Sequence, residues 1–84
     1  MNYSIQIKSS AAKALARIAK PDRMRIIAAI DQLGTVPMSG SALKGEFSGL
    51  RRIRIGDYRV VFEVRHDTLI VLVVRIGHRR SVYA

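Results

Sequence analysis

The chain has no cysteine and no tryptophan among its 84 residues. The lack of cysteine excludes a disulfide framework, a thiolate zinc site and a thiol nucleophile. Its longest apolar run, Leu69–Val74, is far shorter than the roughly 20 residues that a membrane-spanning helix needs. The amino-terminal residues lack a basic segment followed by an apolar one. We therefore expect no signal peptide, no membrane partner and a cytoplasmic protein.

Acidic residues are scarce as well. Six Asp and Glu stand against 15 Lys and Arg, which gives a net charge of +9, and 11 of the 15 basic residues are Arg. A folded domain of this charge is expected to bind a polyanion or an acidic protein. The planar guanidinium group suits phosphate and carboxylate oxygens. A well-solvated surface or Arg-rich codon usage also explains the ratio, but explains the clustering described below less well.

Groups for conventional hydrolytic chemistry are few. His66 lies in a predicted turn, where we expect it to be solvated. His78 follows the last predicted strand, where it either borders a site or lies on the surface. No histidines or carboxylates have metal-ligand spacing, and no glycine-rich loop opens a helix. The sequence therefore predicts neither a metal nor a cofactor.

The first elements follow from hydrophobic spacing. An apolar fraction of 49% is ordinary for a folded protein, and the length suits a single domain over residues 1–84. Alternation over Tyr3–Ile7 predicts a short strand. Ser9 or Ser10 is then expected to cap a helix that ends near Ala19.

A second helix is predicted from Pro21, which suits a first turn, to Gly34 as its C-cap. Its buried positions are expected to be Met24, Ile26, Ile27, Ile30 and Leu33. Because only a residue or two separates the two helices, they must form a hairpin. The following segment, Thr35–Gly49, contains glycine, proline and serine and is predicted to be a loop.

A period of two then predicts three strands, Leu50–Ile55, Tyr58–Arg65 and Thr68–Ile76, with turns at Gly56-Asp57 and His66-Asp67. Such short turns make the strands an antiparallel meander. The order β-α-α-β-β-β is an α+β fold: an N-terminal strand, then a two-helix hairpin packed on one face of a small, mainly antiparallel sheet.

The alternation also assigns side chains to the faces of the sheet. Ile53 and Ile55 point toward one face, whereas Arg52, Arg54 and Arg59 point toward the other. On the last strand we expect one face to carry Ile70, Leu72, Val74 and Ile76, and the other to carry Leu69, Val71, Val73 and Arg75. Because like charges opposite each other across strands repel, a bound polyanion would relieve the arginine cluster.

The candidate functional residues form an arginine cluster with a terminal aromatic residue: Arg51, Arg52, Arg54, Arg59, Arg75, Arg79, Arg80 and Tyr83. Such a cluster suits a nucleic-acid-binding surface without chemistry, or a docking site for an acidic partner. It also suits a nuclease that needs no metal. Guanidinium groups would then hold the scissile phosphate while the 2′-hydroxyl of the RNA attacks it, and electrostatic stabilisation would be the main catalytic effect.

Three segments, Leu43–Gly45, Leu50–Phe62 and Val73–Tyr83, resemble the RelE/ParE toxin superfamily, and most closely its RelE branch. The most specific parts are Gly-Asp-Tyr-Arg-Val-Val and the final Gly-His-Arg-Arg-x-Val-Tyr. The resemblance covers essentially the whole chain. It implies the RelE-like microbial RNase fold and a toxin of a type II toxin–antitoxin system.

The resemblance further implies a ribosome-dependent endoribonuclease that cuts mRNA in the A site through the 2′-hydroxyl and so inhibits translation. Carried over by position, the implied catalytic residues are Arg52, Arg54, Arg59, Arg79 and Tyr83. Arg59 would stabilise the phosphate, Arg79 would lie near the leaving 5′-oxygen, and Tyr83 would stack on a base. Further RNA contacts are expected from Lys44, Arg51, Arg75, His78 and Arg80.

The chain departs from the family pattern at the clamp. Well-known members have Lys where this chain has Arg52 and Arg54, and an Arg with a pKa above about 12 is no general base at neutral pH. Either another group, for which His78 is the nearby candidate, takes the 2′-hydroxyl proton, or the reaction depends on electrostatics alone. The chain also ends one residue after Tyr83, without the C-terminal helix that some members carry.

Two other functions remain open. A ParE-like protein would inhibit DNA gyrase, although such members commonly lack the arginine and tyrosine set. An inactive toxin-fold protein would only bind its antitoxin or DNA. For the leading interpretation, the expected partners are an acidic, RelB-like antitoxin, the ribosome and mRNA, and operator DNA reached through the antitoxin.

Overall fold

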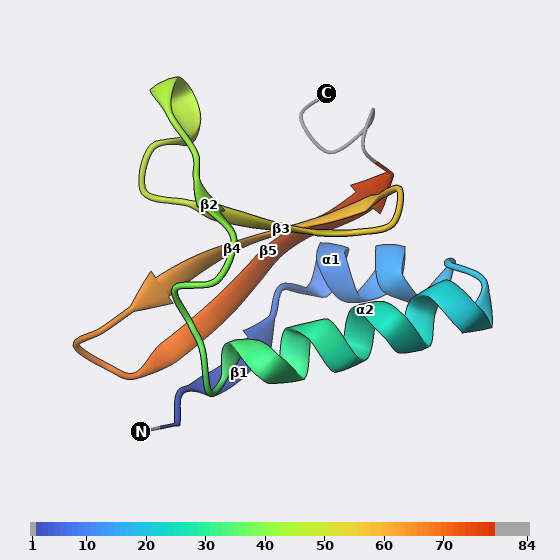
Figure 1. Ribbon diagram of the computed structural model, residues 1–84, viewed down its shortest axis with the longest axis horizontal. Coiled ribbons are helices and arrows are strands. Elements are labelled where there is room, and N and C mark those ends of the chain that lie inside the picture. Colours follow the sequence, from blue (N-terminus) through green and yellow to red (C-terminus); the bar gives the residue numbers. More distant parts are fainter. Residues whose placement is uncertain (1, 79–84) are drawn as a thin grey trace.

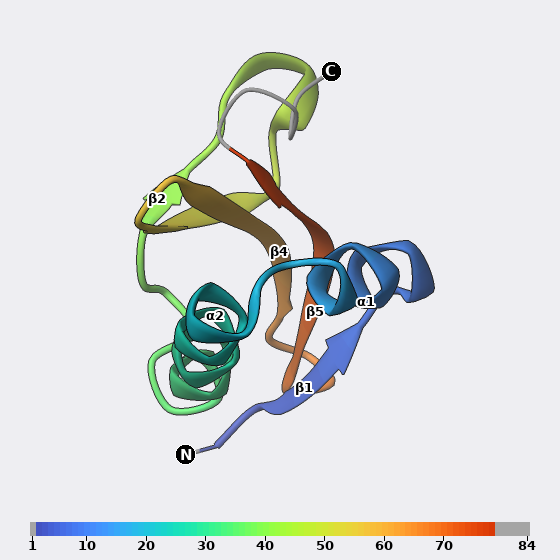
Figure 2. The same ribbon diagram turned by 90° about the vertical axis from the view of Figure 1, so that its right-hand side faces the viewer.

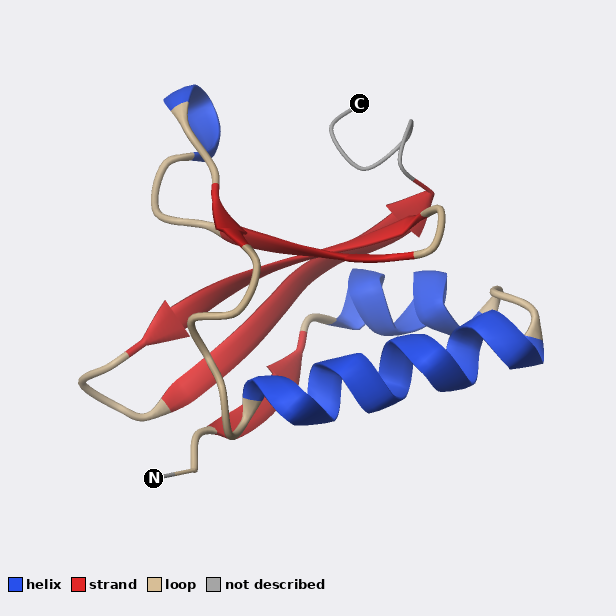
Figure 3. Cartoon of the chain, viewed as in Figure 1, coloured by secondary structure: helices blue, strands red, loops and turns tan. Residues whose placement is uncertain are grey.

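The computed structural model describes residues 2–78 as a twisted sheet with two helices on one side (Figure 1). The elements are β1 (Ser4–Ile7), α1 (Ser9–Ala16), α2 (Lys20–Leu33), β2 (Ser41–Ala42), the 3-10 turn η1 (Gly45–Phe47), β3 (Arg51–Ile55), β4 (Tyr58–Arg65) and β5 (Ile70–His78). The sheet order is β1-β5-β4-β3-β2, with β1 parallel to β5 and the other pairs antiparallel. The predicted α+β fold is confirmed. The two-residue β2 and η1 lie inside the predicted loop (Figure 3).

The hydrophobic core lies between the sheet and the helices. In Figure 2, α1 runs beside β5 and α2 lies toward β3. The helical segment contributes Ala11, Leu15, Ile18, Ile26, Ile30 and Leu33, and the sheet contributes Val60, Phe62, Val71, Val73 and Ile76. Burying one such large aliphatic or aromatic side chain stabilises the fold by about 1.5–3 kcal/mol. Phe62, in the middle of β4, is fully buried and forms the centre of this layer.

Both helices differ in detail from the sequence prediction. The N-cap of α1 is Lys8, with no side-chain capping bond, and α1 ends at Ala16 rather than near Ala19. Proline in the first turn of α2 is confirmed. Met24 is 53% exposed and does not join the buried stripe. It lies two positions from the fully buried Ile26, which is about 200° around the helix.

Gly34 is the C-cap of α2, but it does not adopt the left-handed conformation that usually favours glycine there. Its φ is −62°, which any residue adopts. A Cβ at this position would lie 3.0 Å from the carbonyl oxygen of Tyr3, and the Tyr3 N–H donates a 2.7 Å hydrogen bond to the Gly34 carbonyl. The glycine therefore allows the end of α2 to approach the start of β1.

A β-bulge on β5 overturns the predicted faces of that strand. Val61 pairs with Arg75, but its neighbour Phe62 pairs with Val73, so Val74 is an extra residue. Val73 faces the helices before the bulge and Ile76 does so after it, and both are buried. The prediction that Arg75 shares a face with Val73 is therefore wrong, because the bulge reverses the alternation.

The connection between β4 and β5 is also longer than predicted. The turn covers His66–Leu69, and Leu69 has a left-handed φ of 55°, so β5 starts at Ile70. The Tyr3 hydroxyl lies 2.7 Å from Nδ1 of His66, which ties this turn to the amino-terminal segment. Within residues 2–78, no helix is long and apolar enough to cross a membrane.

Candidate nucleic-acid interface

Four neighbouring arginines lie on the face of the sheet that points away from the helices. Arg52 pairs with Val61, which pairs with Arg75. Two residues further along, Arg54 pairs with Arg59, which pairs with Gly77. Residues in register across a sheet lie on the same face. Because the intervening row contains the buried Val60 and Ile76, which belong to the core, the arginines face the opposite side. We call Arg52, Arg54, Arg59 and Arg75 the arginine face.

The residues of the arginine face come from three adjacent, hydrogen-bonded strands. Directly opposed Cβ atoms lie about 4.5–5.5 Å apart, so Arg54 and Arg59 bring their positive charges close together. Arg52 and Arg59 are half-buried, whereas Arg54 and Arg75 are exposed. The arrangement therefore presents two partly anchored and two accessible guanidinium groups to a ligand.

Val61 is the apolar centre of the arginine face. It is only 2% exposed although it points away from the helices. Arg52 and Arg75 flank it in register on the two neighbouring strands, and their methylene stems can cover it while the charged ends reach solvent. Packing of these stems against Val61 therefore helps to fix the positions of Arg52 and Arg75.

An acidic side chain at the far end of β4 is already paired. The Nε atom of Arg65 lies 2.7 Å from Oε1 of Glu63. Hydrogen bonding and charge attraction from Glu63 raise the pKa of Arg65. This pair occupies the same face as Val61, by alternation along β4. Glu63 therefore lies on the same side of the sheet as the arginine face, two residues beyond Val61, and is paired with Arg65.

Two surface depressions border the arginine face. One is lined by Gly40, Ser41, Arg52, Ile53 and Arg54. The other is lined by Arg54, Gly56, Asp57, Tyr58 and Arg59. Arg54 borders both depressions, which places it between them. A chain of phosphates could follow this path over adjacent strands.

The structure places Arg51 apart from the arginine face. Arg51 pairs with the buried Phe62 and thus lies on the helix side. Its Nη2 donates hydrogen bonds to the carbonyls of Met38 at 2.7 Å and Gly40 at 3.1 Å, and its Nε donates to Ser39 at 3.4 Å. These bonds hold the segment that leads into β2. This position was predictable from the sequence. Side chains alternate along β3, so Arg51 shares the helix side with Ile53 and Ile55.

Gly40 is the point where this segment meets β3. Its φ is 77°, and a Cβ there would overlap the carbonyl oxygen of Arg52. Glycine is therefore required by both conformation and space. Gly40 lines the depression beside Arg52, and Arg51 donates a hydrogen bond to the Gly40 carbonyl. Arg51 therefore helps to position one side of this depression.

The other sequence-predicted RNA contacts are dispersed. Lys44 is exposed directly before η1, in a loop that rises on the side of the sheet opposite the helices (Figure 1). His78 pairs with Tyr58 on the helix-side row, and the two rings meet edge to face at 6.0 Å. The structure does not bring His78 onto the arginine face. Arg79, Arg80 and Tyr83 lie outside the described residues.

The chemistry of the described site is electrostatic. Among residues 2–78, no cluster of His, Cys, Asp or Glu is suited to hold a metal ion. Guanidinium groups stay charged at neutral pH and donate hydrogen bonds to phosphate oxygens. The arginine face can therefore hold and neutralise a phosphate group, but offers no titrating group of its own.

Comparisons with known proteins point to one superfamily. A protein-family model described as the ParE toxin of the type II toxin–antitoxin system parDE matches residues 5–83. No curated protein matches the chain. Among solved structures, an archaeal RelE–RelB complex from Pyrococcus horikoshii matches with 27% identity and a TM-score of 0.82, over 96% of this chain and 99% of that one.

Two further structures support the fold. The RelBE2 toxin–antitoxin complex from Mycobacterium tuberculosis matches with 22% identity and a TM-score of 0.86, over 94% of this chain and 100% of that one. A free RelE toxin variant from E. coli matches with 20% identity and a TM-score of 0.82, over 99% and 92% of the two chains. The similarity thus extends over nearly the full length of each compared chain.

Proposed function

Because the chain belongs to the ParE toxin family of type II toxin–antitoxin systems, within the RelE/ParE superfamily, we propose that it is a ribosome-dependent endoribonuclease that cleaves mRNA in the A site. The observation that carries this proposal is the arginine face. Three arginines of the family-like motif, Arg52, Arg54 and Arg59, project from one side of β3 and β4. A surface of this kind suits a scissile phosphate.

In the proposed reaction, the 2′-oxygen of the RNA forms a bond to the adjacent phosphorus and the bond from phosphorus to the 5′-oxygen breaks. The 2′-hydroxyl loses its proton to water, and the leaving 5′-oxygen gains one. The products are a 2′,3′-cyclic phosphate and a 5′-hydroxyl. Arg52 and Arg54 clamp the phosphate, and Arg59 stabilises the extra negative charge of the transition state. Arg79 acts near the 5′-oxygen and Tyr83 stacks on a base, as the family resemblance implies.

No general base is assigned on the arginine face. A guanidinium group is no general base at neutral pH, and His78 lies on the helix-side row against Tyr58. We therefore assign catalysis to positioning and electrostatic stabilisation. The ribosome would supply the positioning by holding the mRNA with its 2′-oxygen aligned to the phosphate.

The proposed binding partner is an acidic antitoxin. The similar RelE structures include complexes with RelB antitoxins, and a protein of net charge +9 is attracted to an acidic partner. Such an antitoxin would neutralise the toxin and carry it to operator DNA. Both proteins would act in the cytoplasm.

The matching family description names ParE, which favours inhibition of DNA gyrase as a second candidate. Induction of the chain, with and without its antitoxin, followed by mapping of mRNA 5′ ends separates the two. New 5′ ends within translated codons are expected for the endoribonuclease. A gyrase supercoiling assay that shows inhibition, with unchanged mRNA, would instead establish the second candidate. An absence of both effects would indicate an inactive toxin fold.

A further inference from the structure

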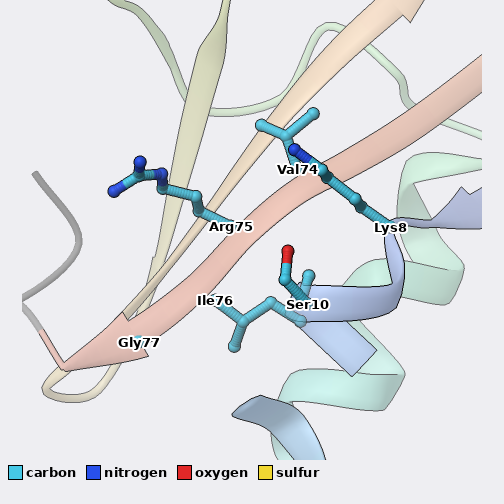
Figure 4. Close-up of a pocket in the computed structure, with 7 residues that line it drawn as sticks. Lys8, Ser10, Val74, Arg75, Ile76 and Gly77 are labelled. Carbon is cyan, nitrogen blue, oxygen red and sulfur yellow. The ribbon is translucent and has the colours of Figure 1, made fainter. Parts of the chain in front are cut away.

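A pocket lies at the edge of β5, where β1 ends and α1 begins (Figure 4). It has a volume of about 310 Å³ and is lined by Lys8, Ser10, Ala11, Val74, Arg75, Ile76 and Gly77. β1 pairs with β5 only as far as Val73. Beyond that residue the edge of β5 borders this pocket instead of a strand. We call it the bulge pocket, because Val74 is the bulged residue.

The bulge pocket is contiguous with the arginine face through Arg75. The bulge turns Arg75 away from the helices and into register with Val61 and Arg52. Arg75 therefore belongs to both the arginine face and the lining of the pocket. A ligand that lies along the arginine face can reach the pocket without leaving the positively charged surface.

Lys8 adds a second cation from the neighbouring segment. Ile7 pairs with the buried Val73 on the helix side, so alternation places Lys8 on the side of the arginine face. The Lys8 N–H donates a 2.9 Å hydrogen bond to the Val73 carbonyl, which anchors its backbone beside the bulge. Figure 4 shows the Lys8 side chain extended toward Val74 and the Arg75 side chain leaving the other edge of β5.

The lining chemistry favours an anion. The pocket contains two cationic side chains and one hydroxyl group, that of Ser10, and none of its seven lining residues is acidic. Two of the lining residues, Ala11 and Ile76, are buried. A phosphodiester group combines a negative charge with oxygens that accept hydrogen bonds from such groups.

We propose that the bulge pocket binds a backbone phosphate of the RNA strand whose scissile phosphate the arginine face holds. Lys8 supplies the charge, Ser10 donates a hydrogen bond, and Arg75 connects the two phosphate positions. This inference rests on the proposed function. It extends the RNA path from β3 and β4, across β5, to the segment between β1 and α1.

The salt dependence of RNA binding tests this inference. Fluorescence anisotropy of a labelled single-stranded oligouridylate, titrated with the full-length protein over a range of KCl concentrations, gives the slope of log K against log salt. Each phosphate contact on a single strand contributes about 0.7 to the magnitude of this slope. Lys8→Gln should lower it by about that amount, whereas Lys8→Arg should retain it. Both variants keep the backbone N–H that anchors residue 8.

Lys13→Gln is the matched control, because Lys13 is also exposed near the start of the chain but does not line the bulge pocket. Equal slopes for Lys8→Gln and Lys13→Gln would overturn the inference. So would a Lys8→Gln variant that binds the acidic antitoxin less tightly but keeps its RNA slope, because the pocket would then serve a protein.

Arg59→Gln separates this inference from the proposed function. If both Arg59→Gln and Lys8→Gln lower the slope, the arginine face and the bulge pocket both bind RNA. If only Lys8→Gln lowers it, the pocket stands and the assignment of the scissile phosphate to the arginine face fails. If only Arg59→Gln lowers it, the pocket is rejected and the arginine face stands.

Discussion

Arg51 and Arg52 are neighbours in the sequence, yet they have different surroundings. Arg51 donates hydrogen bonds to the Met38, Ser39 and Gly40 carbonyls on the helix side. Arg52 lies on the arginine face in register with Val61. The alternation of a strand causes this difference. At the scale of single residues, an arginine cluster therefore contains both structural and ligand-facing members.

Arg51→Ala should lower the stability of the fold. Removing the guanidinium leaves three carbonyl groups without this donor, and the free energy of unfolding should fall by about 1–3 kcal/mol. Arg51→Lys should restore little, because an ammonium group does not reproduce the fork of donors. Urea unfolding measures both. Arg54→Ala is the control, since an exposed arginine should change stability by no more than about 0.5 kcal/mol. Equal losses for Arg51→Ala and Arg54→Ala would refute the structural role.

Arg59→Ala should abolish cleavage without comparable loss of stability. Deleting one donor that stabilises transition-state charge typically lowers the rate about 10²–10³-fold. Single-turnover cleavage on ribosomes measures this rate, and thermal unfolding monitors the fold. Arg17→Ala, an exposed arginine after α1, is the control and should cleave normally. Retained cleavage by Arg59→Ala would remove Arg59 from the site.

Tyr83 lies outside the described residues, and its stacking role stays a prediction. A base stacked on an aromatic side chain contributes about 1–3 kcal/mol. Tyr83→Phe should therefore keep most cleavage activity and Tyr83→Ala should lose it, with little change in melting temperature for either variant. If Tyr83→Phe is as inactive as Tyr83→Ala, the hydroxyl group takes part in the reaction. A parallel fall in melting temperature and activity for Tyr83→Ala would make the residue structural.

At the scale of elements, the bulge in β5 organises the site. It keeps Val73 and Ile76 in the core while turning Arg75 toward Arg52. The sequence does not reveal it, because Leu69–Val74 is apolar at every position and gives no contrast between the two faces. β3 was predictable for the opposite reason, since isoleucine and arginine alternate along it. The two residues of β2 are too few to produce a periodic signal.

Deleting Val74 should cost little stability. Val73 pairs with Phe62 and Arg75 pairs with Val61, so removing the extra residue leaves regular pairing in which Arg75 still lies on the arginine face and Ile76 still joins the core. Deletion of Val61 from β4 is the contrasting variant, because it turns the buried Val60 or Phe62 out of the core, and the loss of one such side chain removes about 1.5–3 kcal/mol. Chemical denaturation measures both variants. A Val74 deletion that lowers stability as much as the Val61 deletion would contradict the assignment of Val74 as the extra residue.

At the scale of the whole molecule, the hydrophobic core and the arginine face lie on opposite sides of the sheet. The helices cover one side of the sheet (Figure 1) and enclose the core. The strand register places the arginine face on the other side. The net charge of +9 attracts a polyanion to this molecule. The arginine face supplies phosphate-binding groups and contains no general base, and Glu63, on the same side of the sheet, is paired with Arg65. Such a protein needs a substrate that is already positioned.

The rate of RNA cleavage with and without ribosomes shows whether this protein depends on a positioned substrate. The same mRNA is presented to the wild-type protein either free or threaded through ribosomes with an empty A site, and its 5′ ends are mapped over time. We expect efficient cleavage in the A site of the ribosome-bound mRNA and little cleavage of the free RNA, because alignment by the ribosome replaces a general base. Comparable cleavage rates for the two substrates would contradict it.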